Sequence, residues 1–129
     1  MARLLIVDDD QALLFVIGEH LAAHGFELDF ASSAAQARHC LERSEYDAVL
    51  SDYNMPGESG LDLLGHISAR YPGLPFILMT GSGMLEDKVM KMGSSGYVAK
   101  PFQIMDLVGT IEAVLSFSNR QGRALASTG

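Results

Sequence analysis

Short apolar runs alternate with longer amphipathic segments, and this alternation constrains the fold more than any other feature of the chain. The runs lie at residues 4–7, 26–31, 47–51, 75–79 and 96–99. Each run has the length of a strand and is too short for a buried helix. Strands that are continuously apolar and strictly alternate with helices predict a mainly parallel sheet covered on both faces.

Capping residues indicate where the intervening helices begin and end. Asp10 can cap the first helix, and Gly25 can end it. Ser33, followed by Gln36 three residues later, has a capping-box pattern, and Ser59 can cap a third helix. The expected helices run between Asp10 and Gly25, from Ser33 to about Arg43, over 61–70, over a short segment that ends before Gly93, and from Ile104 to Leu115.

Length and charge narrow the class of protein. The 129 residues suit one compact domain, which we expect over residues 1–117, followed by a polar, aperiodic tail or linker stub over 118–129. The net charge of −7 argues against direct binding to nucleic acid or to an anionic membrane. No apolar stretch approaches the length of a membrane span, so we expect a cytoplasmic protein. Because no further domain is expected after residue 117, the output should pass through protein contacts.

The single cysteine limits the chemistry available to the chain. Because Cys40 is the single cysteine of the sequence, an internal disulfide and a cysteine-based zinc site are both excluded. It stands in a helical segment among Ala and Leu, where a small buried apolar side chain is the simplest interpretation.

Polar residues follow several of the expected strands directly. Asp8, Asp9 and Asp10 follow the first strand, and Asp52 follows the third, with Asn54 two residues on. Thr80 follows the fourth strand, and Lys100 with Pro101 follows the fifth. In a parallel sheet these carboxyl ends share one edge, which is where ligands bind in such folds. Each residue alone has an ordinary interpretation as a cap, a turn or a surface charge, but their coincidence predicts a functional site.

Crowded carboxylates repel one another, and a divalent cation removes that conflict. Mg²⁺ prefers oxygen ligands, so we expect Asp9 and Asp52 as direct ligands, Asp8 acting through water, and a main-chain carbonyl near Asn54. An aspartate beside a metal, an ammonium and a hydroxyl can accept a phosphoryl group. Lys100 and Thr80 would then stabilise the phosphoryl oxygens.

Four sequence blocks resemble the receiver domain of two-component response regulators, most simply the single-domain chemotaxis type. The blocks are LLIVDDD at 4–10, DAVLSDYNMPGESGLDLL at 47–64, PFILMTG at 75–81 and GYVAKPF at 96–102. The resemblance implies a flavodoxin-like three-layer α/β/α sandwich, with a five-stranded parallel sheet in the order 2-1-3-4-5 and five helices. It also implies a phosphorylation-controlled switch rather than an enzyme with a separate substrate.

The resemblance assigns roles to individual residues. Asp52 becomes the acceptor of a phosphoryl group from a histidine kinase or phosphotransfer protein, and Asp8 and Asp9 become the acidic pair that holds Mg²⁺, with Mn²⁺ as an alternative. Thr80 and Tyr97 become the switch residues. Lys100 becomes the phosphate-contacting lysine, before a cis bond to Pro101. The fourth helix, fifth strand and fifth helix would present the changed face to a downstream protein.

The sequence departs from the family at two points. The 20 residues from Thr80 to Lys100 are slightly fewer than expected, which bears on the fourth helix and the output face. Gly81 stands where an alanine is common after the switch threonine.

Two other functions compete with the switch. One is a phosphohydrolase with an aspartyl nucleophile after the first strand, resembling the haloacid-dehalogenase group, for which Asp52 would be unexplained. The other is an interaction scaffold that does not depend on phosphate. Steady release of phosphate would favour the first, and the lack of any Mg²⁺-dependent response to acetyl phosphate or beryllofluoride would favour the second.

Overall fold

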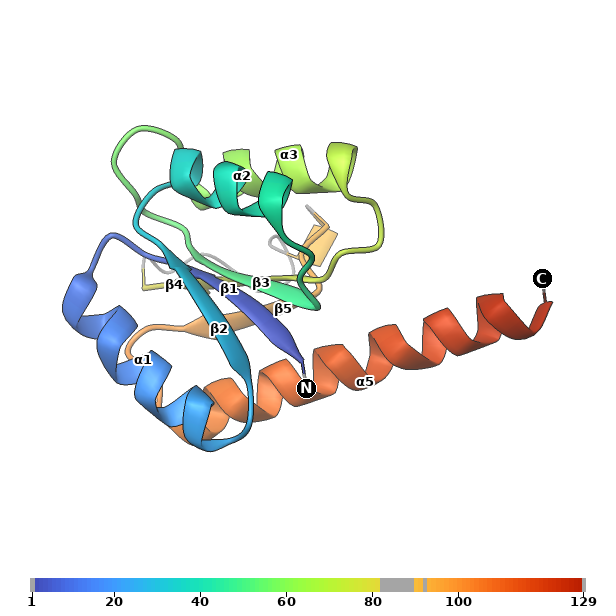
Figure 1. Ribbon diagram of the computed structural model, residues 1–129. Helices are drawn as coiled ribbons and strands as arrows, with labels where there is room; N and C mark the ends of the chain where they lie inside the picture. The colour runs from blue at the N-terminus through green and yellow to red at the C-terminus, as the bar shows by residue number, and fades with distance from the viewer. Residues whose placement is uncertain (1, 82–89, 92, 129) are drawn as a thin grey trace.

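A parallel five-stranded sheet lies between helices that cover both of its faces (Figure 1). The computed structural model describes residues 2–81, 90–91 and 93–128, with side chains described up to residue 117. The strands stand in the order β2-β1-β3-β4-β5, and every neighbouring pair is parallel. The expected flavodoxin-like topology is therefore confirmed.

The elements follow the expected alternation closely. They are β1 Arg3–Val7, α1 Gln11–Ala23, β2 Glu27–Ala31, α2 Ala34–Arg43, β3 Ala48–Asp52, α3 Gly60–Arg70, β4 Phe76–Thr80, β5 Gly96–Ala99 and α5 Ile104–Thr128. The short helix expected before Gly93 falls largely on residues 82–89 and 92, which lie outside the described residues.

The predicted capping residues begin their helices. The side chains of Asp10, Ser33 and Ser59 accept hydrogen bonds from backbone N–H groups in the first turns of α1, α2 and α3. The full reciprocal capping box occurs at α3, where the Asp62 side chain accepts from the Ser59 backbone. Gln36 does not complete the box predicted at Ser33, because its side-chain oxygen accepts from the backbone and hydroxyl of Ser32 instead.

Each face of the sheet has its own apolar core, because successive strand residues point to opposite faces. Leu4 and Ile6 pack in the cluster that includes residues of α1 and α5. Leu5 and Val7 pack in the cluster that includes residues of α2 and α3. Cys40 is partly buried against this second cluster, as its apolar setting in the sequence indicated.

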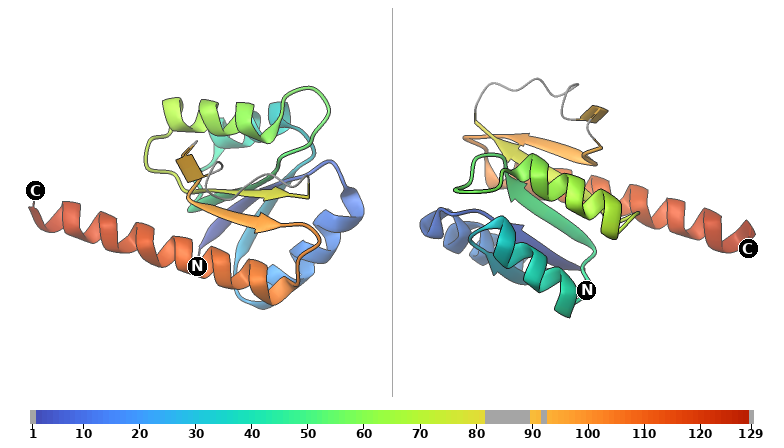
Figure 2. Two further views of the ribbon diagram at one scale, coloured as in Figure 1. Left: turned by 180° about the vertical axis from the view of Figure 1, so that it is seen from behind. Right: turned by 90° about the horizontal axis from the view of Figure 1, so that it is seen from above.

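The last helix is longer than the sequence pattern predicted. We expected an irregular tail after residue 117, but α5 continues to Thr128 and its end projects away from the sheet (Figure 2). Residues 118–128 contain several good helix formers and no proline, so a helix can continue there without an apolar stripe. Within the described residues, no helix is long and apolar enough to cross a membrane.

Candidate functional site

The polar residues predicted at the strand ends meet at one edge of the sheet. Asp8 follows β1, Asp52 ends β3, Thr80 ends β4, and Lys100 follows β5. These four strands are consecutive neighbours in the sheet, so their carboxyl ends lie side by side. The fold therefore brings together residues that are up to 92 positions apart in the sequence.

Lys100 joins the carboxylates of two strands. Its Nζ lies 2.7 Å from Oδ2 of Asp8 and 3.2 Å from Oδ1 of Asp52. Asp8 is 1% exposed and Asp52 is 7% exposed, so both carboxylates are largely withdrawn from water. The backbone N–H of Asp10 donates a further bond, of 3.0 Å, to Oδ1 of Asp8. The ammonium thus partly compensates two buried acids that would otherwise repel each other.

Three carboxylates form a group that could hold a metal ion. Oxygens of Asp8, Asp9 and Asp52 all lie within 4.8 Å of one another, and Asp9 is exposed while the other two are buried. Oxygen-only donors suit Mg²⁺, which keeps part of its water shell. With Lys100 as the ammonium, three negative charges and one positive charge leave two negative charges, the complement of one divalent cation.

The setting changes the ionisation of both Asp52 and Lys100. Burial raises the pKa of the Asp52 carboxyl, and the charge of Asp8 raises it further, while Lys100 and the backbone N–H of Asn54 oppose the shift. Burial alone would lower the pKa of Lys100, but the hydrogen bond and charge of Asp8, with those of Asp52, outweigh it and raise the pKa. Lys100 is therefore an ammonium at neutral pH, and the raised pKa of Asp52 means that its carboxyl ionises less readily than a solvated one.

Thr80, Tyr97 and Asn54 occupy different positions around this group. Thr80 is 1% exposed at the end of β4, and its carbonyl accepts a 2.8 Å bond from the backbone N–H of Lys100. Tyr97 is half-buried in β5 and packs against the apolar core on the side of α2 and α3. Asn54 is exposed in the loop after β3, two residues beyond Asp52. The Lys100–Pro101 peptide bond is cis, as the resemblance implies.

Two contacts that hold the loop after β3 could not be predicted from the sequence. The guanidinium of Arg38, on α2, pairs with the carboxylate of Glu58 in that loop. Gly60 packs directly on the acceptor segment: a Cβ there would lie 2.3 Å from the carbonyl oxygen of Asp52. The capping signal at Ser59 marked the start of α3 but gave no indication that the next residue must be a glycine.

Gly81 leaves room that the usual alanine would fill. A Cβ at Gly81 would lie 3.4 Å from Cβ and from the carbonyl oxygen of Lys100, an ordinary contact distance. The departure from the family at this position therefore adds space beside Lys100 and does not block the site.

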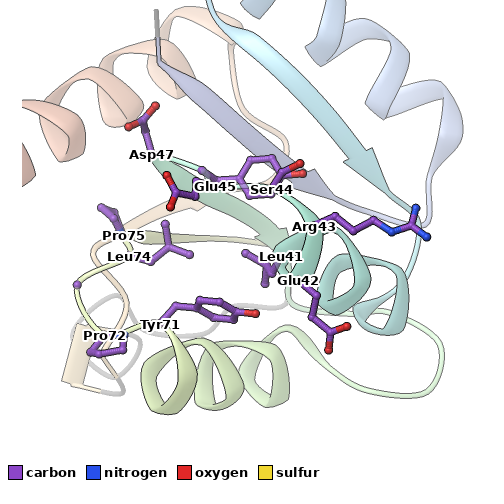
Figure 3. A pocket seen from close by; sticks show the side chains of 12 residues that line it. Leu41, Glu42, Arg43, Ser44, Glu45, Asp47, Tyr71, Pro72, Leu74 and Pro75 are labelled. Carbon is purple, nitrogen blue, oxygen red and sulfur yellow. The ribbon is translucent and has the colours of Figure 1, made fainter.

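A separate hollow of about 690 Å³ lies away from the carboxylates (Figure 3). It is formed by the segments that lead into β3 and β4, at the opposite ends of the strands from Asp52. Tyr71 and Leu74 lie on one side of it, and Leu41 and Glu42 on the other (Figure 3). The acidic cluster and Lys100 lie at the strand ends and not in this hollow.

A doubly wound α/β fold with an acidic cluster and a lysine together at the carboxyl ends of its strands defines a protein of the phosphorylation-controlled signalling class. The sequence model of the response regulator receiver domain matches residues 4–112. The chain belongs to this family of two-component response regulators.

Relatives and solved structures agree with this assignment. The chain is 41% identical over 112 residues to the response regulator protein FleR of Pseudomonas aeruginosa, covering 83% of this chain and 24% of FleR. It is 30% identical, with a TM-score of 0.88, to a CheY-like receiver domain from Methanospirillum hungatei, covering 94% of this chain and 98% of that one. It is also 29% identical, with a TM-score of 0.82, to the response regulator TrrA of Thermotoga maritima in complex with Mg²⁺ and BeF, covering 88% and 99%.

The match to curated relatives covers part of their length. The chain spans about a quarter of FleR and about half of the transcriptional regulatory protein BasR of Escherichia coli, with coverages of 24% and 56%.

Proposed function

We propose that Asp52 accepts a phosphoryl group from the phosphohistidine of a histidine kinase or phosphotransfer protein. The observation that carries this proposal is the position of Asp52 at the end of the central strand β3, with Lys100 Nζ 3.2 Å from its carboxylate. Asp8 and Asp9 are candidates for metal contacts and Lys100 for a contact with the phosphoryl oxygens, whereas Asp52 ends the strand at the middle of the cluster.

The transfer is a displacement at phosphorus. A carboxylate oxygen of Asp52 forms the new P–O bond, the P–N bond of the donor breaks, and the imidazole nitrogen keeps the electron pair. The ammonium of Lys100 stabilises the charge on the phosphoryl oxygens. Because burial and Asp8 raise the pKa of Asp52, neutralising nearby charge also favours the ionised carboxylate that must attack.

The oxygens of Asp8, Asp9 and Asp52 would hold Mg²⁺, or Mn²⁺ in its place, together with the main-chain carbonyl of Asn54. When bound, the ion neutralises the phosphoryl oxygens during transfer. The Mg²⁺–BeF complex of TrrA, a structural relative, supports this assignment by similarity.

The switch would pass from Thr80 to Tyr97. The Thr80 hydroxyl, at the end of β4, donates to a phosphoryl oxygen, and Tyr97 moves into the space that this leaves. The segment between β4 and β5, with β5 and α5, then offers a changed face to a downstream protein. The net charge of −7 favours a protein over nucleic acid as the direct partner of this domain.

We also propose that residues 1–117 form the receiver unit and that residues 118–129 are a tail or a linker stub. The family match ends at residue 112, and the helix runs on to Thr128 beyond the body of the sheet (Figure 2).

Acetyl phosphate and beryllofluoride, each with Mg²⁺, test the role of Asp52. With acetyl phosphate, intact-mass spectrometry should find one added phosphoryl group on the wild type and none on Asp52→Asn. Beryllofluoride transfers no phosphoryl group and should change the conformation of the wild type but not that of Asp52→Asn. Asp106→Asn, which removes an exposed carboxylate on α5, is the matched control and should be modified like the wild type. Equal modification of Asp52→Asn would show that another residue is the acceptor.

The uptake of phosphoryl groups and the release of phosphate together distinguish the competing functions. A switch takes up one phosphoryl group and turns over no separate substrate. Continuous release of phosphate from p-nitrophenyl phosphate would identify a phosphohydrolase instead. The absence of any Mg²⁺-dependent modification or spectral change in the wild type would identify a scaffold.

A further inference from the structure

An apolar groove of about 650 Å³ lies between α1 and β2, at the free edge of the sheet. Figure 1 shows α1 beside β2, on the face of the sheet opposite α2. Two polar side chains, Gln11 and Glu19, stand among its lining residues. The remaining lining residues of this α1–β2 groove are Leu14, Phe15, Gly18, Ala22, Phe26, Leu28 and Phe30.

Two aromatic side chains in the groove are open to solvent. Phe15 on α1 is 66% exposed and Phe30 on β2 is 45% exposed. Aromatic side chains bury a large apolar area when they are removed from water, and they are frequent anchors of protein interfaces. An exposed aromatic pair over an apolar floor therefore indicates a surface that is covered by a partner.

Gly18 shapes the floor of the groove. A Cβ at this position would lie 2.7 Å from Cζ of Phe30, so the ring rests directly on the backbone of α1. Glycine in the interior of a helix costs about 1 kcal/mol relative to alanine. Without a Cβ at Gly18, the Phe30 ring can lie against the helix, whereas an alanine at this position would push the ring outward.

The charged side chain among the lining residues of the groove is the acid Glu19. Residues 8–31 contain six acids and neither lysine nor arginine. Two of them do not add to the charge of the groove, because Asp8 is paired with Lys100 and Asp29 with Arg3. Glu19 lines the groove itself, and Asp10 and Glu27 are exposed near the N-termini of α1 and β2. The hollow of Figure 3, in contrast, has Arg43 among its acids.

We infer that the α1–β2 groove binds an amphipathic helix of a partner protein, with an apolar stripe on Phe15 and Phe30 and Lys or Arg residues toward Glu19. An apolar floor with an acidic margin complements this combination of side chains. The occupant would leave Asp52 accessible, because β1 separates β2 from β3 in the sheet. Binding is therefore independent of phosphorylation, unlike binding at the face formed by β5 and α5.

A pair of designed peptides tests this inference on the full chain. Each has about 18 residues with leucines at helical spacing, and the remaining positions are Lys in one peptide and Glu in the other. Titration into the ¹⁵N-labelled protein should shift amide signals of α1 and β2 with the Lys peptide. The Glu peptide should bind at least about tenfold more weakly.

Variants locate the binding surface. Phe15→Ser should weaken binding of the Lys peptide at least about tenfold. Phe117→Ser is the matched control, because Phe117 on α5 is exposed to a similar extent, 64% against 66% for Phe15. Gly18→Ala, which pushes the Phe30 ring outward, should also weaken binding while circular dichroism shows an intact fold. Asp52→Asn should bind as the wild type does, so this result does not depend on the proposed phosphorylation.

Several results would overturn the inference. They are equal affinity of wild type and Phe15→Ser, an equal loss in Phe117→Ser, and equal binding of the Glu peptide. Sedimentation of the protein alone is a further check: a dimer abolished by Phe15→Ser would show that a second copy of the chain occupies the groove instead.

Discussion

The ammonium of Lys100 lies 2.7 Å from Oδ2 of Asp8, although 92 positions separate the two residues in the sequence. The contact joins the end of β1 to the end of β5 across the middle of the sheet, and Asp52 on β3 lies between them. A buried carboxylate that loses its cation is costly, because the desolvated charge stays in place. The same lysine therefore contributes both to the stability of the sheet edge and to the proposed phosphoryl site.

Lys100→Met should lower the free energy of unfolding by about 2–4 kcal/mol in the absence of Mg²⁺. Asp8 and Asp52 would then face each other without their ammonium. Mg²⁺ should stabilise this variant more than it stabilises the wild type, because the cation binds the folded state more tightly when no ammonium offsets the charge of the carboxylates. Urea unfolding with EDTA and with Mg²⁺ measures both effects. Lys91→Met is the control, since Lys91 is exposed; a similar loss in both variants would rule out a specific role of the Asp8 contact.

Asp9→Asn should weaken Mg²⁺ binding at least about tenfold and leave the unfolding free energy without metal almost unchanged. Asp9 is exposed, so its charge is solvated before metal binds, and it lies within 4.8 Å of the other carboxylates. Isothermal titration calorimetry provides the affinity. Asp10→Asn is the control: Asp10 is also exposed but caps α1, and asparagine caps helices equally well. Unchanged affinity in Asp9→Asn would remove Asp9 from the ligand set.

Gly60→Ala should destabilise the protein by about 2–4 kcal/mol and slow phosphorylation by acetyl phosphate. The new Cβ would lie 2.3 Å from the carbonyl oxygen of Asp52, so the backbone of the acceptor segment must shift. Gly65→Ala, on the same helix, is the control, because its Cβ would meet nothing within 4 Å. That variant should gain about 1 kcal/mol from helix propensity. If both variants behaved alike, the packing of Gly60 on Asp52 would have no influence on the site.

Much of the fold and the composition of the site could be predicted from local patterns. The caps at Asp10, Ser33 and Ser59 depend on the nearest three residues, and parallel topology requires that strand ends meet. The burial of Asp8 and the exposure of Asp9 could not be predicted, because the direction of each side chain depends on where the strand ends.

Contacts between distant segments also could not be predicted from the sequence. The pairing of Arg38 with Glu58 depends on the path of an irregular loop beside α2. The contact of Phe30 with Gly18 depends on how closely β2 approaches α1, and a glycine inside a helical pattern gives no indication of which ring will cover it. The helical continuation after residue 117 has no apolar stripe, so its propensity was the only signal available.

Tyr46 should increase the free energy of unfolding at neutral pH, and this contribution should disappear at high pH. Burial raises the pKa of the Tyr46 phenol, and the 2.6 Å hydrogen bond that it donates to Oδ2 of Asp29 raises it further, while Arg3 contacts the same oxygen at 2.8 Å. A raised pKa means that the folded state favours the neutral phenol. The contribution is therefore complete below the usual phenol pKa of about 10 and is lost as the pH rises through the higher folded value.

Tyr46→Phe should be less stable than the wild type by about 1–2 kcal/mol at neutral pH, since it lacks a hydrogen bond to a charged group. The difference should narrow above about pH 10, where the unfolded wild type gains stability by ionising its phenol and the variant does not. Guanidinium unfolding between neutral pH and pH 11.5 measures this difference. The control Tyr71→Phe keeps the bond from Tyr46 to Asp29 and should lose the same stability with pH as the wild type does. A difference between wild type and Tyr46→Phe that stayed constant over this range would show that the bond to Asp29 does not hold the phenol neutral.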